Sequence, residues 1–243
     1  MKSIITIGLP SKGRLKDKAI SFFNERGLKI LQNEKERNYF GTIENKPDIK
    51  IIFLHAKEII QRLGDGTLDM GVSGLDLLKE SGKNLQGKIN IQRKLDFGNA
   101  NLVIAVPDDW IDVQTIADLE EVSFDIRSKR NARLRVATKY PNLTNDFLVS
   151  RGVTQYKLIP SLGATETYPF IGSSEIITDI TSTGKTLADN NLRVLKDGLI
   201  LNSNACLFIA KKKGCKTAAF FKIFYVGETT FSYWFKLIIV KFF

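Results

Sequence analysis

Short apolar segments rich in β-branched residues alternate along this chain with segments of helical apolar spacing. The strand-like segment Ser3 to Leu9 is followed, after the turn PSKGRL, by the helical segment Lys16 to Gly27. The same order recurs at Lys50 to Leu54 and Ala56 to Leu63. A helix between two strands is the usual crossover that joins parallel strands. The alternation therefore predicts an α/β fold.

The alternation continues through the rest of the sequence. Further strand-like segments lie at Leu68–Val72, Asn101–Val106, Leu134–Thr138, Gln155–Ile159, Glu175–Ile180, Leu192–Leu195 and Ala205–Ala210, and further helical ones at Asp76–Glu80 and Thr144–Arg151. Two α/β lobes joined by crossing strands fit this order better than a single sheet does. Ligand sites in such folds lie at the carboxyl ends of the strands.

Charge and targeting signals restrict the class of protein. Of the net charge of +10, seven lysines and one glutamate from Lys211 onward contribute +6, which leaves +4 for the first 210 residues. A modestly basic body suits small anionic substrates better than it suits nucleic acid. We find no signal peptide pattern and no apolar run long enough for a transmembrane helix. With only two cysteines, the chain is expected to be cytoplasmic, without nucleic-acid or membrane partners.

The segment EIITDITSTGKTL is the most informative for chemistry. Its strand delivers Asp179, whose carboxylate can accept hydrogen bonds from neighbouring sugar hydroxyls. Gly184 lets the backbone approach an anion or adopt positive φ, and consecutive backbone N–H groups in such a turn form an anion site. The segment suits a ribose 5-phosphate, although an ordinary surface turn uses the same residue types. Only Gly184-Lys185-Thr186 matches a Walker A loop, so a kinase or ATPase is not expected.

Several segments together resemble the ATP phosphoribosyltransferase family. Besides TSTGKTL, these are PSKGRL, LDMGVSGLDLL, KLDFGNANLVIAVP, RVATKYPNL and GATETYPFIGSSE, in the family's order between about Ile4 and Ala210. The resemblance implies two periplasmic-binding-protein-like lobes of type II with a cleft between them. The first lobe would comprise residues 1–92 plus about 190–215, and the second residues 93–189.

The family's reaction is a glycosyl transfer in histidine biosynthesis, in which adenine N1 of ATP displaces pyrophosphate from phosphoribosyl pyrophosphate. The resemblance implies Mg²⁺ as the cofactor, with metal ligands that we leave open. It places Asp179 on the ribose hydroxyls, and it implies that the 5-phosphate is bound by Thr181, Ser182, Thr183, Gly184, Lys185 and Thr186. Its remaining expected site residues are Lys12 and Arg14 at the phosphates, Glu166 near the substrate, and Ser11, Gly13, Gly71, Gly74 and Asp96 around the cleft.

Some of these residues also fit plainer roles. Lys12 and Arg14 could belong to a solvated turn, Glu166 could be a helix-start carboxylate, and Asp96 fits a structural role better than a catalytic one. His55, the single histidine, fits a polar position after a strand, and we do not assign it as a general base.

The length implies the short form of the family, because only 33 residues follow Ala210, too few for a regulatory domain. Short-form members work with a regulatory subunit that resembles a histidyl-tRNA synthetase (HisZ-type), so a homodimer within a hetero-octamer is expected. The tail 216–243 is atypical for the family, and its role could be a poorly ordered terminus, an interaction element or a membrane-surface segment.

Three other functions compete with this one. A non-catalytic two-lobe binding protein would share the fold. A single-sheet phosphoribosyltransferase usually places two adjacent acids before its loop, whereas Asp179 stands alone. A nucleic-acid binder is suggested by the pI of about 9.5.

Overall fold

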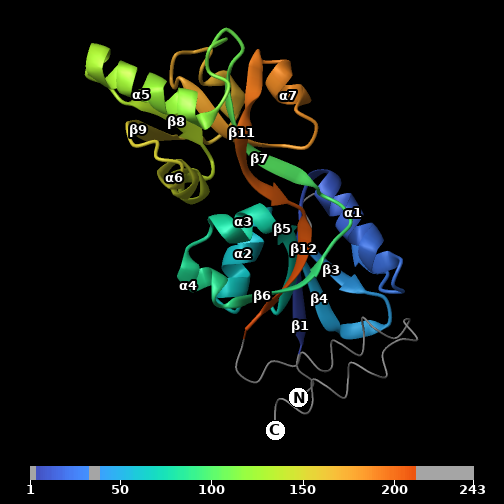
Figure 1. Cartoon of the computed structure of the whole chain (residues 1–243). Coiled ribbons are helices and arrows are strands. Elements are labelled where there is room, and N and C mark those ends of the chain that lie inside the picture. Colours follow the sequence, from blue (N-terminus) through green and yellow to red (C-terminus); the bar gives the residue numbers. More distant parts are fainter. Residues whose placement is uncertain (1–3, 33–38, 212–243) are drawn as a thin grey trace, which may run out of the picture.

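The fold consists of two β-sheets, each with its own helices. The computed structural model describes residues 4–32 and 39–211. The seven-stranded sheet has the order β2-β3-β4-β1-β5-β12-β6, and the five-stranded sheet has the order β11-β7-β10-β8-β9 (Figure 1). We call the part built on the seven-stranded sheet the first lobe and the part built on the five-stranded sheet the second lobe.

The first lobe is built around three parallel strands. Its strands are β1 (Ile5–Pro10), β2 (Ile30–Gln32), β3 (Phe40–Ile43), β4 (Lys46–Leu54), β5 (Met70–Gly74), β6 (Ile89–Lys94) and β12 (Ala205–Ala210). Strand β1 pairs in parallel with both β4 and β5, while β12 is antiparallel to β5 and β6. Both β1 and β12 lie inside the sheet with neighbours on each side and are buried on both faces, which explains why they lack polar alternation.

Helices cover both faces of the first sheet. They are α1 (Gly13–Asn24), α2 (Ala56–Gly64), α3 (Leu75–Glu80) and α4 (Lys83–Gln86). Phe23 of α1 packs with Ile7 and Phe53 on one face. Ile59 of α2 and Leu78 of α3 pack with residues such as Phe208 on the other face (Figure 1). Each sheet face is thus closed by the apolar stripe of a helix.

The second lobe has a mixed sheet. Its strands are β7 (Ala100–Pro107), β8 (Leu134–Thr138), β9 (Tyr156–Pro160), β10 (Ile176–Thr181) and β11 (Leu192–Ser203). Strand β8 is parallel to β9 and β10, whereas β7 is antiparallel to β10 and β11. Its helices are α5 (Ile116–Arg130), α6 (Pro141–Ser150), the 3₁₀ turn η1 (Thr165–Thr167) and α7 (Lys185–Ala188). A capping box between Thr115 and Asp118 starts α5.

A two-stranded ribbon connects the lobes. On one side the chain passes from β6 to β7, and on the other from β11 to β12 (Figure 1). The two passages are hydrogen-bonded to each other, since Leu95 N donates to the Ala205 carbonyl at 2.8 Å and Ala205 N to the Phe97 carbonyl at 3.0 Å. The antiparallel ribbon is therefore continuous from one sheet into the other.

The ribbon corrects the expected boundaries of the lobes. We expected the return to the first lobe near residue 190, but β11 pairs antiparallel with β7, and the chain rejoins the first sheet only at β12. The first passage begins after Lys94 rather than Gln92, because β6 pairs with β12 through that residue. The strands β2, β3 and β6 were not predicted.

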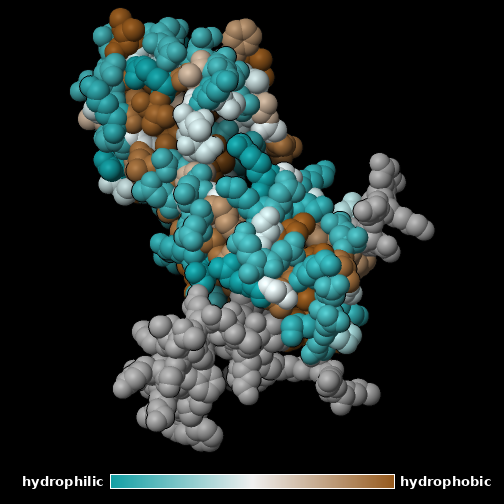
Figure 2. Space-filling model, turned by 90° about the vertical axis from the view of Figure 1, so that its right-hand side faces the viewer, coloured by the Kyte–Doolittle hydropathy of each residue, from teal (hydrophilic) through white to brown (hydrophobic). Residues whose placement is uncertain are grey.

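The α/β organisation in two sheets, predicted from the alternation, is confirmed. Hydrophilic residues cover most of the face shown in Figure 2, with small hydrophobic groups on both lobes. Within the described part of the chain, no helix is long and apolar enough to cross a membrane. The atypical tail, 216–243, lies outside the described residues.

Packing of β5 against α2 gives a first prediction. A Cβ on Gly71 would lie 2.5 Å from Cγ2 of the buried Ile59 and 3.2 Å from the Gly8 carbonyl oxygen. Overpacking of this kind costs about 1–3 kcal/mol, so Gly71→Ala should lower the urea midpoint of unfolding. Gly82→Ala is the control, because φ at Gly82 is −59° and no described atom lies within 4 Å of its added Cβ. Equal midpoints for the two variants would contradict the packing role.

Candidate active site

Asp179 lies near the carboxyl end of β10, beside the end of the parallel strand β8. Thr178 is opposite Thr138 in the register of these two strands. Two parallel neighbours bring their following loops to the same edge of the sheet. The turn after Thr138 therefore lies next to the loop after Asp179. The two strands are distant in the sequence, since Arg135 and Glu175, which are hydrogen-bonded to each other near the strand starts, are 40 residues apart.

The carboxyl group of Asp179 is half-buried among charged groups. Burial raises its pKa above the ordinary aspartate value, and the nearby charge of Glu166 raises it further. The Ile180 N–H, which donates to Asp179 Oδ1 at 2.8 Å, and the charge of Lys139 lower it in part. The structure thus brings Asp179 together with Glu166 of η1 and with Lys139 of the β8–α6 turn.

The loop after Asp179 is organised by its own hydroxyl groups. Thr181 Oγ1 accepts from Gly184 N at 2.8 Å, and Thr183 Oγ1 accepts from Lys185 N at 3.4 Å. Gly184 precedes α7 with φ of 74°, which agrees with the positive φ anticipated for it. Ser182, Thr183, Lys185 and Thr186 are exposed, so their side chains face solvent at this edge of the second lobe.

The PSKGRL segment occupies the corresponding edge of the first lobe. Ser11 N donates to the Leu54 carbonyl at 2.9 Å, which joins the ends of β1 and β4. Lys12 is the extended residue before α1, and Gly13 begins that helix with φ of 70°. Lys12 and Arg14 are exposed, so both charges are accessible at the start of α1.

The remaining predicted residues occupy three different environments. Gly71 lies under α2, which gives it a packing reason that is independent of any substrate. Gly74 lies at the end of β5, where an added Cβ would collide with the carboxylate of Asp76. Asp96 is exposed in the passage from β6 to β7.

Sequence reasoning missed two residues near Asp179 and two acids that contact the segment following β8. Lys139 and Tyr140 follow β8, and Asp76 and Glu80 come from α3 of the first lobe. The Tyr140 hydroxyl donates to Asp76 Oδ2 at 2.9 Å, and burial followed by the charge of Asp76 raises the pKa of Tyr140. Burial also raises the pKa of Glu80, although backbone N–H groups of Leu143 and Asn142 lower it in part. The segment KYP directly after a strand was the available signal for the first two residues.

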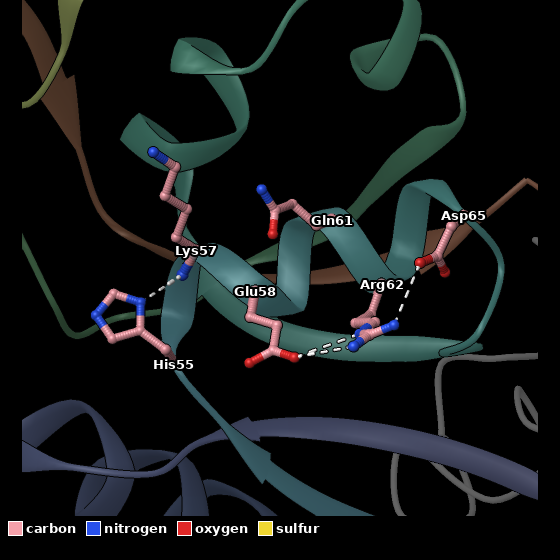
Figure 3. A pocket seen from close by; sticks show the side chains of 6 residues that line it. All are labelled: His55, Lys57, Glu58, Gln61, Arg62 and Asp65. Atoms are coloured by element: carbon pink, nitrogen blue, oxygen red, sulfur yellow. Dashed lines mark hydrogen bonds and ion pairs between the residues drawn. The ribbon is translucent and has the colours of Figure 1, made fainter.

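A pocket of about 460 Å³ lies elsewhere, along α2 of the first lobe (Figure 3). Its lining consists of His55, Lys57, Glu58, Gln61, Arg62 and Asp65. Arg62 pairs with Glu58 at 3.3 Å and with Asp65 at 3.8 Å, and His55 Nδ1 accepts from Lys57 N. Since Glu58, Arg62 and Asp65 pair with one another and the lining comes from a single helix and its flanks, we keep Asp179 as the centre of the candidate site. His55 acts as the cap of α2.

Comparison with known sequences identifies close relatives. The family model described as HisG: ATP phosphoribosyltransferase matches residues 55–224. An ATP phosphoribosyltransferase of Rhizobium etli (strain CIAT 652) is 47% identical over 210 residues, which cover 86% of this chain and 91% of that protein. An ATP phosphoribosyltransferase of Brucella melitensis biotype 2 is 46% identical over 209 residues, which cover 86% and 90%.

Solved structures show the same two-lobe fold at lower identity. The ATP phosphoribosyl transferase (HisG:HisZ) complex from Thermotoga maritima contains a chain with a TM-score of 0.68 and 24% identity, covering 91% of this chain and 96% of that chain. A probable amino-acid transporter extracellular-binding protein from Bacillus subtilis has a TM-score of 0.51 at 14% identity, covering 89% and 88%. These likenesses show the type II periplasmic-binding-protein-like fold. The sequence matches decide the function: this chain belongs to the ATP phosphoribosyltransferase family, which catalyses the first step of histidine biosynthesis.

Proposed function

We propose that the chain binds the phosphoribosyl group of its substrate at Asp179 and the loop Thr181–Thr186. The observation that carries this proposal is the half-buried carboxylate at the end of β10, followed at once by a loop with Gly184 at positive φ. A carboxylate accepts hydrogen bonds from the two ribose hydroxyls, and the exposed Ser182, Thr183, Lys185 and Thr186 can donate to the 5-phosphate. Gly184 leaves room for the phosphate beside the backbone.

The second substrate, ATP, is proposed to approach from the first lobe. In the family's reaction, adenine N1 forms a bond to the anomeric carbon while the bond to the pyrophosphate oxygen breaks, and the electron pair leaves with pyrophosphate. Such a displacement depends on alignment and on neutralising the leaving group. Lys12 and Arg14 are exposed cations at the start of α1, and they are suited to contact pyrophosphate or ATP phosphates. Ser11, Gly13 and Gly74 would line the space between the lobes.

We also propose that Mg²⁺ is the divalent cation used with these substrates. Within the described ranges, 4–32 and 39–211, no group of three His, Cys, Asp or Glu side chains could hold a metal. Mg²⁺ is commonly bound by one or two carboxylates together with substrate phosphates. Asp179, whose pKa the charge of Glu166 raises, and Glu166 itself fit that mode of binding. The bound ion would neutralise charge that develops on pyrophosphate.

A hetero-oligomer is the proposed working form. The structure with a TM-score of 0.68 is of a HisG:HisZ complex, which supports a HisZ-type regulatory subunit for this chain. The short form that the sequence resembles is part of the same proposal. We further propose a cytoplasmic location and a homodimer as the catalytic unit.

The proposal is tested by mixing the full-length chain with ATP, phosphoribosyl pyrophosphate and Mg²⁺, with and without the HisZ-type subunit. Phosphoribosyl-ATP is followed by its ultraviolet absorbance, and pyrophosphate release is the independent check. Product that increases with the subunit is expected. If neither substrate binds to the purified complex, the assigned site is wrong.

Asp179→Asn should raise the KM for phosphoribosyl pyrophosphate at least tenfold, because the amide offers one acceptor oxygen and no charge to the ribose hydroxyls. The raised pKa of Asp179 adds a pH prediction. The carboxyl group stays protonated to a higher pH than an ordinary aspartate, so kcat/KM should fall as the pH decreases through the raised pKa. Asp179→Asn should lack that acidic limb in a pH profile. Wild-type kinetics for this variant would exclude the sugar-binding role.

Gly184→Ala should weaken phosphoribosyl pyrophosphate binding by at least tenfold in titration calorimetry. The added methyl group would stand where the phosphate approaches, at a φ of 74° that favours glycine. Gly152→Ala is a matched control, since its φ is 82° and, as at Gly184, no described atom lies within 4 Å of the added Cβ. Both variants should lose similar stability, and only Gly184→Ala should lose affinity. Equal affinities would contradict the phosphate-loop assignment.

A further inference from the structure

The lobes meet at a buried polar contact that we call the α3–α6 junction. It consists of Asp76 and Glu80 on α3, Tyr140, Asn142 and Leu143 at the start of α6, and Ser203 at the end of β11. Asp76, Glu80, Tyr140 and Ser203 have exposed fractions of 6%, 8%, 6% and 6%. Buried carboxylates are costly unless they are hydrogen-bonded, so the partners of these two acids are structurally significant.

Glu80 serves as the N-terminal cap of a helix in the other lobe. Asn142 N donates to Glu80 Oε1 and Leu143 N donates to Glu80 Oε2, each at 3.0 Å. The Asn142 side-chain amide also donates to the Glu80 carbonyl at 2.8 Å. The first N–H groups of a helix lack partners within it, and a negative charge there is favourable. The position of Glu80 therefore fixes the position of the first turn of α6.

Asp76 joins three parts of the chain. Its Oδ2 accepts from the Tyr140 hydroxyl at 2.9 Å, and its Oδ1 accepts from Ser203 Oγ at 2.7 Å. Asp76 N in turn donates to Ser203 Oγ at 3.0 Å. Gly74 is needed for this arrangement, because a Cβ there would collide with Asp76 Oδ1. The first lobe thus holds both the ribbon and the segment before α6.

The junction extends directly to the candidate active site. Tyr140 N donates to Thr138 Oγ1 at 2.9 Å, and Thr138 lies opposite Thr178 in the sheet. Lys139 is exposed between these two anchored residues, and its charge acts on the Asp179 carboxyl group. The charge of Asp179 also acts on Tyr140. A shift of Tyr140 would therefore move Lys139 relative to Asp179.

We propose that Asp76 and Glu80 are positioning residues for the phosphoribosyl transfer, which hold the Thr138–Leu143 segment so that Lys139 stays beside Asp179. This inference rests on the proposed role of Asp179. In this view, two acids of the first lobe fix the position of the substrate-binding edge of the second lobe. Alignment of this kind contributes strongly to transfer reactions that depend on substrate orientation.

The test compares two tyrosine variants in the full-length chain with its regulatory subunit. Tyr140→Phe removes the hydroxyl that bonds to Asp76. Tyr156→Phe is the matched control, because its hydroxyl donates to Asn145 Oδ1 at 2.7 Å elsewhere in the same lobe. Tyr140→Phe should lower kcat/KM for phosphoribosyl pyrophosphate about tenfold, because a small misplacement of a substrate-binding group slows a reaction that depends on alignment. Tyr156→Phe should leave kcat/KM unchanged. Glu80→Gln, which replaces one acceptor oxygen by a donor, should act in the same direction as Tyr140→Phe.

A double-mutant cycle distinguishes positioning from simple stability. In a Lys139→Met background, Tyr140→Phe should have little further effect on kcat/KM, because the charge that it positions is already gone. If the two effects multiply, or if Tyr140→Phe lowers the melting temperature without changing kcat/KM of the folded enzyme, the positioning role is wrong.

Asp179→Asn, assayed alongside, separates this inference from the proposed function. If Asp179→Asn loses activity while Tyr140→Phe does not, the positioning role alone is contradicted. If Asp179→Asn retains activity, the assigned sugar site itself is contradicted.

Discussion

The relation between the two lobes depends on the α3–α6 junction. The antiparallel ribbon at Leu95–Phe97 and Ala205 joins the sheets covalently, but a two-stranded ribbon by itself can bend and twist. Asp76 and Glu80 add buried acceptors from the first lobe whose donors belong to the second lobe and to the crossing strand. Separating the lobes would leave two carboxylates without those partners. Removing one partner of a buried charged group costs far more than an exposed ion pair contributes, so this contact is selective for one arrangement.

That arrangement matters because the proposed functional groups are divided between the lobes. Asp179 and the 181–186 loop lie at one edge of the second sheet, and Lys12 and Arg14 lie at the edge of the first. A displacement at the anomeric carbon needs the phosphoribosyl group and the attacking adenine to be aligned within a few tenths of an ångström. The junction adjoins Lys139 through Tyr140, and it adjoins the end of β5 through Asp76. A change in the angle between the lobes would therefore shift these residues and alter the alignment of the two substrates.

The sequence predicted those features that depend on local pattern. Apolar periodicity identified the strands that contain Asp179 and Ala205–Ala210, and the glycine at 184 was placed in a turn for its backbone freedom, which its φ of 74° bears out. Pairings between distant segments were not predictable in the same way. The β11 return was misjudged because its apolar pattern is compatible with either sheet, and partner choice is a tertiary decision. Likewise, Glu80 and Asn142 are 62 residues apart, and neither residue type indicates in the sequence that Glu80 caps a helix of the other lobe.

Membership of the family is evidence for the enzymatic function of this protein, whereas its fold alone is not. Amino-acid binding proteins share its two lobes at 12–14% identity, so the architecture alone is compatible with binding without chemistry. What separates the enzyme from such binding proteins is the 47% identity to ATP phosphoribosyltransferases, and the proposed site is the half-buried carboxylate with the hydroxyl-rich loop at one strand end. A binding protein needs its lobes only to enclose a ligand, whereas a transferase must also hold two substrates in register. A junction of buried carboxylates, whose hydrogen bonds have narrow distance and angle requirements, meets that stricter demand better than apolar contact would.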